Sequence, residues 1–161
     1  MFEPVNYDGN LQKKYDMLYK QLDALLEDED DPTANLANAT ALLQQFLDRT
    51  NWVGFYLLKE GELVLGPFQG LPACVRIQVG KGVCGTAAKT LETQVVEDVH
   101  QFPGHIACDA ASQSEVVVPI IMNDQVYGVL DIDSPEKARF SEEEGRLLTV
   151  FVEHLVPHLQ R

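Results

Sequence analysis

The sequence has few cysteines, few basic residues and no long apolar run, and each shortage excludes a class of protein. The chain has 12 Lys and Arg and 25 Asp and Glu, so its net charge is −13. This negative charge argues against nucleic acids and anionic membranes as partners. No apolar run reaches the roughly 18 residues of a membrane-spanning helix. The N-terminus lacks a basic region followed by an apolar one, so no signal peptide and a cytoplasmic location are expected. In such a reducing compartment, three cysteines are not a structural disulfide framework.

Helical periodicity appears at both ends of the chain. Leucines and tyrosines recur at helical spacing over Leu11–Leu26, which predicts an amphipathic helix. Asp31 and Pro32 are typical of the N-cap and first position of a second helix. Ser141, with Glu144 three residues later, is a capping box that predicts the start of a last helix, over about 141–159.

Between these helices, β-branched and aromatic runs predict strands at 52–58, 63–65, 73–79, 94–99, 115–122 and 126–133, with a short helix at 83–89. Consecutive strands joined by short turns predict a largely antiparallel sheet with the helices grouped on one face, an α+β arrangement. The length suits one domain over residues 1–161, and no linker divides it.

The three cysteines fall in loops or at a helix start. Cys108 lies in the segment 104–115, whose small and polar residues have no helix or strand period, and ordered loops of this length are usually functional. Cys84 begins the short helix, where the backbone dipole predicts a lowered thiol pKa. Together with Cys74 they favour redox chemistry, with buried structural thiols as the alternative. His105 and Cys108 have metal-ligand spacing, but the other cysteines do not continue the pattern, so no metal site is predicted.

A second group of candidates consists of carboxylates and aromatic residues in strands. Asp131 and Asp133 alternate with apolar residues and therefore share one face of the sheet, and Glu115 starts the neighbouring strand. Crowded carboxylates raise each other's pKa, so one of them can act as a general acid; the alternative is a solvated sheet edge. Trp52 and Tyr56 share a face of their own strand, as a pocket wall for a cationic ligand or as core packing.

Seven motifs occur in one order along the chain. They are Asn51-Trp-Val-Gly-Phe-Tyr, Leu65-Gly-Pro-Phe-Gln-Gly, Ala73-Cys-Val-Arg-Ile, Gly82-Val-Cys-Gly-Thr-Ala, Glu97-Asp-Val-His, Gly104-His-Ile-Ala-Cys-Asp-Ala-Ala-Ser and Gly128-Val-Leu-Asp-Ile-Asp-Ser. Together they resemble the free methionine-(R)-sulfoxide reductases, a family of small cytosolic enzymes built on a GAF domain. The resemblance is dense from Asn51 to Ser134 and looser in the flanking helices.

The resemblance implies a single GAF domain with a central antiparallel sheet of about six strands, and a homodimer formed through the flanking helices. It implies reduction of free L-methionine-(R)-sulfoxide, with no bound cofactor and with thioredoxin, supplied by NADPH through thioredoxin reductase, as the reductant. The family's catalytic cysteine falls on Cys108, the resolving cysteine on Cys74 and an auxiliary one on Cys84, with the roles of Cys84 and Cys108 open to exchange. Its substrate pocket falls on Trp52, Tyr56, Glu115, Asp131 and Asp133.

The residues make chemical sense of this reaction. Carboxylates suit the ammonium of a free amino acid, Trp52 suits its methyl and sulfur, and Glu115, Asp131 or Asp133 can supply the proton that the sulfoxide oxygen needs. A sulfenic acid formed on one cysteine condenses with another thiol to a disulfide, which thioredoxin reopens. The alternatives are a non-catalytic GAF module that senses a small ligand and a thiol-based oxidation sensor that has no substrate.

Overall fold

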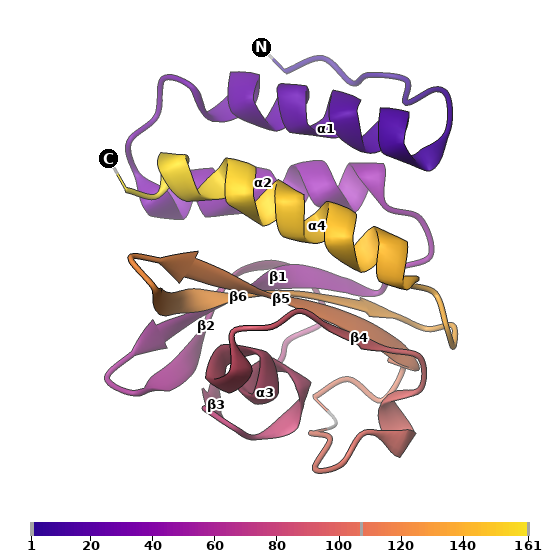
Figure 1. Ribbon diagram of the computed structural model, residues 1–161, viewed down its shortest axis with the longest axis vertical. Helices are drawn as coiled ribbons and strands as arrows, with labels where there is room; N and C mark the ends of the chain where they lie inside the picture. Colours follow the sequence, from indigo (N-terminus) through magenta and orange to yellow (C-terminus); the bar gives the residue numbers. More distant parts are fainter. Residues whose placement is uncertain (1, 107, 161) are drawn as a thin grey trace.

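The computed structural model describes residues 2–106 and 108–160, and its centre is one antiparallel sheet. The six strands lie in the order β3-β2-β1-β6-β5-β4 (Figure 1), which confirms the expected sheet. The strands are β1 (Trp52–Lys59), β2 (Glu62–Gly70), β3 (Arg76–Gln78), β4 (Gln94–Val96), β5 (Ser114–Met122) and β6 (Gln125–Ser134). The hairpins β1–β2 and β5–β6 are joined through the pairing of β1 with β6, so residues from both hairpins meet at the middle of the sheet.

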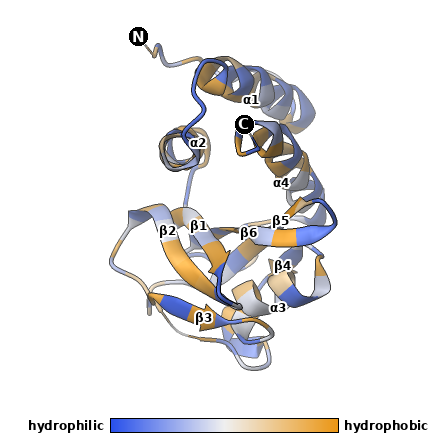
Figure 2. Cartoon of the chain, turned by 90° about the vertical axis from the view of Figure 1, so that its left-hand side faces the viewer, coloured by the Kyte–Doolittle hydropathy of each residue, from blue (hydrophilic) through white to orange (hydrophobic). Residues whose placement is uncertain are grey.

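Helices cover both faces of the sheet. The long helices α1 (Leu11–Leu26), α2 (Pro32–Phe46) and α4 (Glu142–Leu155) gather on one face, and the short α3 (Gly82–Thr90) lies on the other (Figures 1 and 2). The predicted position of the terminal helices is therefore confirmed, whereas the prediction that all helices share one face is wrong for α3. Among the residues that the structure describes, no helix has the length and apolarity needed to cross a membrane.

The strands are apolar on both faces, which explains the placement of α3. Alternation along β1 sends Val53 and Phe55 into the core beneath the long helices, and Trp52 and Tyr56 into a second core. Val83 belongs to that second core, together with other small apolar residues of α3. The sheet thus separates a large helical core from a smaller one, and all the candidate site residues lie on the side of the smaller core.

Two predicted strands are shorter than expected. The run predicted at 94–99 ends at Val96, and a 3-10 helix, η1 (Val99–Gln101), follows. Asp98 starts this turn because its side chain accepts a hydrogen bond from the backbone N–H of His100. The run predicted at 73–79 pairs as a strand only over the three residues of β3.

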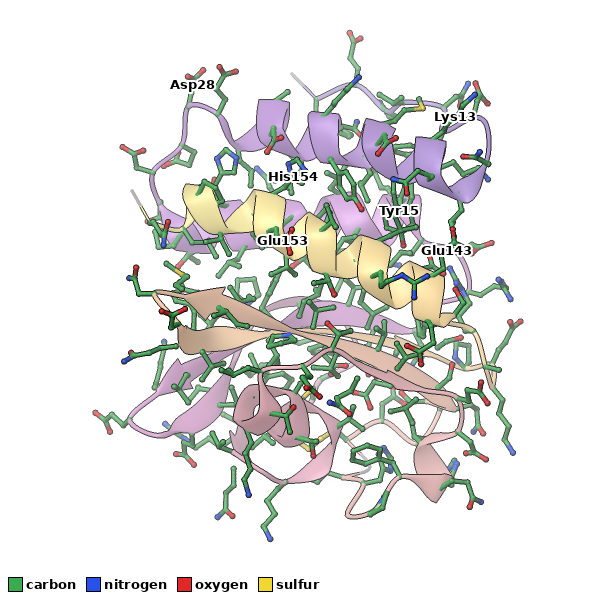
Figure 3. All side chains as sticks on the ribbon, viewed as in Figure 1. Lys13, Tyr15, Asp28, Glu143, Glu153 and His154 are labelled. Atoms are coloured by element: carbon green, nitrogen blue, oxygen red, sulfur yellow. A yellow bond between two sulfur atoms is a disulfide. The ribbon has the colours of Figure 1, made fainter. Side chains whose placement is uncertain are left out.

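A buried polar contact ties two of the long helices to each other. Ser141 caps α4 as predicted, since its hydroxyl accepts from the Glu144 backbone N–H at 3.0 Å. The Glu144 carboxylate, however, does not close the capping box. It accepts hydrogen bonds from Arg139 at 2.7 Å and from the Tyr15 hydroxyl at 2.6 Å, which ties α1 to α4; Tyr15 lies between these helices in Figure 3. A last 3-10 turn, η2 (Val156–His158), follows α4.

Candidate active site

Strand register brings the three predicted carboxylates together. Glu115 on β5 is paired with Asp133 on β6, and Asp131 lies two residues earlier on the same face. β1 flanks them on the other side, since Trp52 is paired with Asp133. The side chains of Glu115 and Asp131 are 7% and 6% exposed, so the alternative of a solvated sheet edge is wrong.

Burial of these carboxyls changes their acid–base behaviour. Removal from water raises the pKa of Glu115 and of Asp133 well above ordinary values, and the negative charge of Asp131 raises both further. Burial also raises the pKa of Asp131, but hydrogen bonds from Glu115, Cys84 and Asp133 oppose that rise. Asp131 is therefore the first of the three to ionise, and Glu115 and Asp133 retain their protons to higher pH.

Two of the three cysteines meet at the mouth of this acidic niche. Cys74 and Cys108 form a disulfide across a sequence separation of 34 residues, with Cα atoms 5.4 Å apart. Cys74 precedes β3, whereas Cys108 lies in the long loop before β5. Both half-cystines are partly exposed. Cys108 lines the cavity above the carboxyls, and Cys74 packs against the apolar core beside it.

Cys84 is the free thiol among the described residues, and it is buried. Cys84 lies in the first turn of α3. This turn packs closely against β3, because a Cβ on Gly85 would collide with the carbonyl oxygen of Gln78. Burial, followed by the charges of Asp131 and Glu115, raises the pKa of Cys84 well above its ordinary value. The predicted lowering by the helix dipole is wrong, because loss of hydration outweighs the field of one short helix.

Trp52 and Tyr56 share a face of β1, as predicted, and stack with ring centroids 5.8 Å apart. Both are buried and both line the cavity, so they are core residues and pocket wall at once. Each of these two side chains also donates a hydrogen bond to a backbone carbonyl in the segment that leads to Cys74. The Trp52 indole N–H donates to the Leu71 carbonyl at 3.2 Å, and the Tyr56 hydroxyl donates to the Cys74 carbonyl at 2.8 Å.

A polar clamp that sequence reasoning missed fixes the loop of Cys108. The Asn51 side-chain amide donates to the Asp109 carboxylate at 3.0 Å and to the Ser112 hydroxyl at 3.1 Å. The Asn51 backbone N–H donates to the Asp133 carbonyl, which anchors the clamp to β6. An asparagine directly before a predicted strand was the available signal, but its partners lie 58 and 61 residues away in the sequence.

If the Cys108 thiol attacks a substrate, we expect Asn51→Ala to lower kcat about tenfold or more, because the freed loop no longer holds that thiol in near-attack geometry. The unfolding free energy should fall by about 1 kcal/mol for each lost hydrogen bond. Steady-state kinetics and urea unfolding measure the two effects. The matched control is Asn38→Ala, exposed on α2, which should change neither. A loss of stability without any loss of turnover would show that the clamp serves folding alone.

The cavity is small in this disulfide-bonded state, with about 40 Å³ of space, enough for a few water molecules and too little for an amino acid. Among residues 2–106 and 108–160, one group of side chains could in principle hold a metal ion. It consists of Cys84, Glu115 and Asp131, whose possible ligand atoms all lie within 4.8 Å of one another. One oxygen of Asp131, Oδ1, is buried there without a hydrogen-bond partner. The niche therefore presents oxygen acceptors to a cationic group. The residues that line the cavity are Trp52, Tyr56, Ala73, Ile77, Lys81, Gly82, Val83, Cys84, His105, Ile106, Cys108, Asp109, Ser112, Glu115, Asp131 and Asp133.

Comparisons with known proteins agree with this architecture. A family model described as GAF domain matches residues 29–160. Protein YtsP of Bacillus subtilis (strain 168) is 57% identical over 157 residues, 96% of each chain. The free methionine-R-sulfoxide reductase of Escherichia coli (strain K12) is 51% identical over 146 residues, 91% of this chain and 88% of that one. A structure of free methionine-R-sulfoxide reductase from Neisseria meningitidis in complex with its substrate has a TM-score of 0.93 and 39% identity, and covers 99% of this chain and 96% of that one.

Proposed function

This chain belongs to the GAF-domain family and, within it, to the free methionine-R-sulfoxide reductases, and we propose that it reduces free L-methionine-(R)-sulfoxide by a thiol–disulfide cycle. The observation that carries the thiol mechanism is the Cys74–Cys108 disulfide at the mouth of a cavity whose lining includes the carboxyls of Glu115, Asp131 and Asp133. A disulfide in that place is the product that a sulfoxide leaves after oxidising two thiols.

In the first step the Cys108 thiolate attacks the sulfoxide sulfur. The oxygen passes to Cys108, which becomes a sulfenic acid, and methionine leaves with its sulfur reduced. One proton is consumed because the developing negative charge falls on oxygen. Glu115 and Asp133 are suited to donate it, since their raised pKa values keep them protonated to higher pH than an ordinary carboxyl.

Cys108 is favoured over Cys84 as the nucleophile. Cys108 lines the cavity and is partly exposed, whereas the Cys84 thiol is buried and its raised pKa disfavours the thiolate. Cys74 then attacks the sulfenic acid, which forms the disulfide and releases water. Thioredoxin restores the two thiols and is itself oxidised to a disulfide; NADPH and thioredoxin reductase then reduce thioredoxin.

The substrate is recognised by its charge and by its apolar end. Asp131, the most easily ionised of the three carboxyls, faces the ammonium, and its unpartnered Oδ1 supports that assignment. Trp52 and Tyr56 provide the apolar wall for the side chain. A peptide-linked methionine sulfoxide has no free ammonium to fill the acidic niche, so the proposal includes selectivity for the free amino acid.

Two further parts of the proposal rest on the resemblance in sequence: a cytosolic location and a homodimer formed through the flanking helices. A cytosolic location supplies the reductant that the cycle needs. Sedimentation equilibrium of the purified chain tests the dimer.

The reaction is tested with purified protein, thioredoxin, thioredoxin reductase and NADPH. NADPH consumption should follow addition of free methionine-(R)-sulfoxide and should be absent with the S epimer or with a peptide containing methionine sulfoxide. Dithiothreitol in place of the thioredoxin system should also support formation of methionine from the R epimer. Equal rates with both epimers, or no methionine with either reductant, would contradict the proposal.

A further inference from the structure

The segment that contains Cys74 differs in charge from the rest of the chain. The chain carries 25 Asp and Glu, yet none of them lies between Leu63 and Leu91, a stretch that contains Cys74 and includes Arg76, Lys81 and Lys89. Arg76 is paired with Glu62 just outside this stretch, and Lys81 is exposed and lines the cavity mouth. The segment on the Cys74 side of the disulfide is therefore neutral to basic in a strongly acidic protein, whereas Asp109 follows Cys108 on the other side.

The same region carries exposed apolar side chains. Leu71, Val75 and Ile106 are 64%, 60% and 39% exposed. They precede or follow the two half-cystines by at most three residues, and the disulfide draws their segments together. Ile106 also lies against Gly82 at the start of α3. Large apolar side chains this exposed, close in sequence to both halves of a reactive bond, are typical of a protein-binding surface.

This surface is held in place before any partner arrives. The Leu71 and Cys74 carbonyls accept the hydrogen bonds from Trp52 and Tyr56 described above, so the segment between them is anchored to β1 at both ends. A preordered surface loses little conformational entropy on binding, so a small contact area is sufficient for a transient complex. That suits a partner that must bind and leave once in each catalytic cycle.

The two sulfur atoms are not equally open to an attacking thiolate. Cys108 is followed directly by Asp109, whose negative charge opposes an incoming thiolate and whose carboxylate is fixed by Asn51. Cys74 lies in the acid-free stretch, between the most exposed apolar residues. Attack at Cys74 also expels sulfur from Cys108, the cysteine that must become free for the next substrate.

We propose that Leu71, Val75 and Ile106 form, around Cys74, the docking surface for the protein dithiol that reduces this enzyme, a partner with an apolar and neutral-to-acidic rim around its reactive thiol. The inference rests on the proposed function. The partner's thiolate attacks Cys74 Sγ, the Cys74–Cys108 bond breaks, and Cys108 leaves as a thiolate. The partner's second thiol then attacks the partner's own sulfur in the mixed disulfide and releases Cys74. The partner ends as a disulfide and this chain as two thiols, a transfer of two electrons.

The test measures reduction by thioredoxin and by dithiothreitol in parallel. Leu71→Asp and Val75→Asp should each raise the KM for thioredoxin at least tenfold, because a charge replaces the apolar contact and repels an acidic rim. Turnover with dithiothreitol should stay within twofold of the wild type, since a small dithiol needs no docking surface. Ile121→Asp is the matched control: it is 38% exposed, adds the same charge, lies at the far end of β5 from Glu115, and should change neither rate.

The sign of the partner's charge is tested by Leu71→Lys. This variant should raise the KM for thioredoxin less than Leu71→Asp does, and added salt should narrow the difference. An equal rise for both signs would overturn the charge part of the proposal. An unchanged KM for thioredoxin in both aspartate variants would overturn the proposed docking surface, and the proposed reductase activity would still stand. Absence of methionine formation in the wild type with dithiothreitol would overturn the proposed function first.

The attacked sulfur is identified by trapping. Thioredoxin whose resolving cysteine is replaced by serine stops at the mixed disulfide, and peptide mass mapping then locates the bond. A bond to Cys74 is expected, and Leu71→Asp should lower its yield. A bond to Cys108 would overturn the assignment.

Discussion

Cys108→Ser is expected to lower turnover of free methionine-(R)-sulfoxide by at least about 10³-fold with either reductant, because a serine hydroxyl is not ionised near neutral pH and is a far weaker nucleophile than a thiolate. The substitution removes one sulfur atom from a partly exposed loop residue, so the fold should be retained. Methionine formation followed by chromatography measures the loss. Residual binding of the R epimer, followed by tryptophan fluorescence of Trp52, shows that the pocket is intact.

The other two cysteines provide the matched comparisons. Cys74→Ser should form one equivalent of methionine and then stop, with a sulfenic acid on Cys108 that a sulfenic-acid-selective carbon nucleophile can trap. Cys84→Ser should continue to turn over, since Cys84 contributes neither half of the disulfide. The reverse pattern, a burst lost in Cys84→Ser and kept in Cys108→Ser, would move the nucleophile to Cys84 and contradict the assignment.

These assignments depend on parts of the fold that the sequence predicts to different degrees. Alternation at Asp131 and Asp133 was enough to predict that these two residues share a face. Glu115 joins that face because the register shifts between Ile120 and Ile121; the register set by the turn at Asn123 and Asp124 alone would pair Glu115 with Ile132 instead. The same periodicity placed Trp52 correctly. Local rules are sufficient where the relevant residues lie within one strand, whereas an irregularity such as the one between Ile120 and Ile121 changes the register of a hairpin.

Contacts between distant segments could not be predicted in this way. Spacing alone does not decide which two of Cys74, Cys84 and Cys108 pair, since the choice depends on how the Cys108 loop packs. The Asn51 clamp depends on the same packing. The pKa of Cys84 was predicted in the wrong direction because the helix dipole can be read from a sequence, whereas complete burial beside carboxylates cannot.

Asp133→Asn and Glu115→Gln are each expected to lower kcat/KM about 10²-fold or more at neutral pH, the usual scale for loss of a positioned proton donor. Asp124→Asn, on the exposed β5–β6 turn, is the control and should leave kcat/KM unchanged. The wild-type rate should fall as pH rises through the raised pKa of the donor, because the carboxyl then loses the proton that the sulfoxide oxygen needs. The variant that removes the donor should lose this alkaline limb, whereas replacement of the other carboxyl should shift it.

The same raised pKa values also lower the stability of the folded protein at neutral pH. At a pH above the ordinary values of 4.5 for Glu115 and 3.8 for Asp133, the unfolded chain has released these protons and the folded protein still holds them. The unfolded state then binds fewer protons, so the unfolding free energy falls as pH rises through this window. Asp133→Asn removes the carboxyl and with it the pH dependence of stability that the carboxyl causes. The variant should be more stable than the wild type at neutral pH by about 1 kcal/mol, which raises the melting temperature by about 2–4 °C.

A variant that is both more stable and less active would show that the acidic niche is maintained for catalysis at a cost to folding, as expected where a function requires crowded, desolvated carboxyls. Calorimetry of Asp133→Asn and wild type at acidic and neutral pH separates the two effects. Below the ordinary carboxyl pKa values the melting temperatures should converge, because both forms of the wild type are then protonated. A stability difference that stays constant with pH would instead indicate a packing effect of the amide and would remove the raised carboxyl pKa as the explanation.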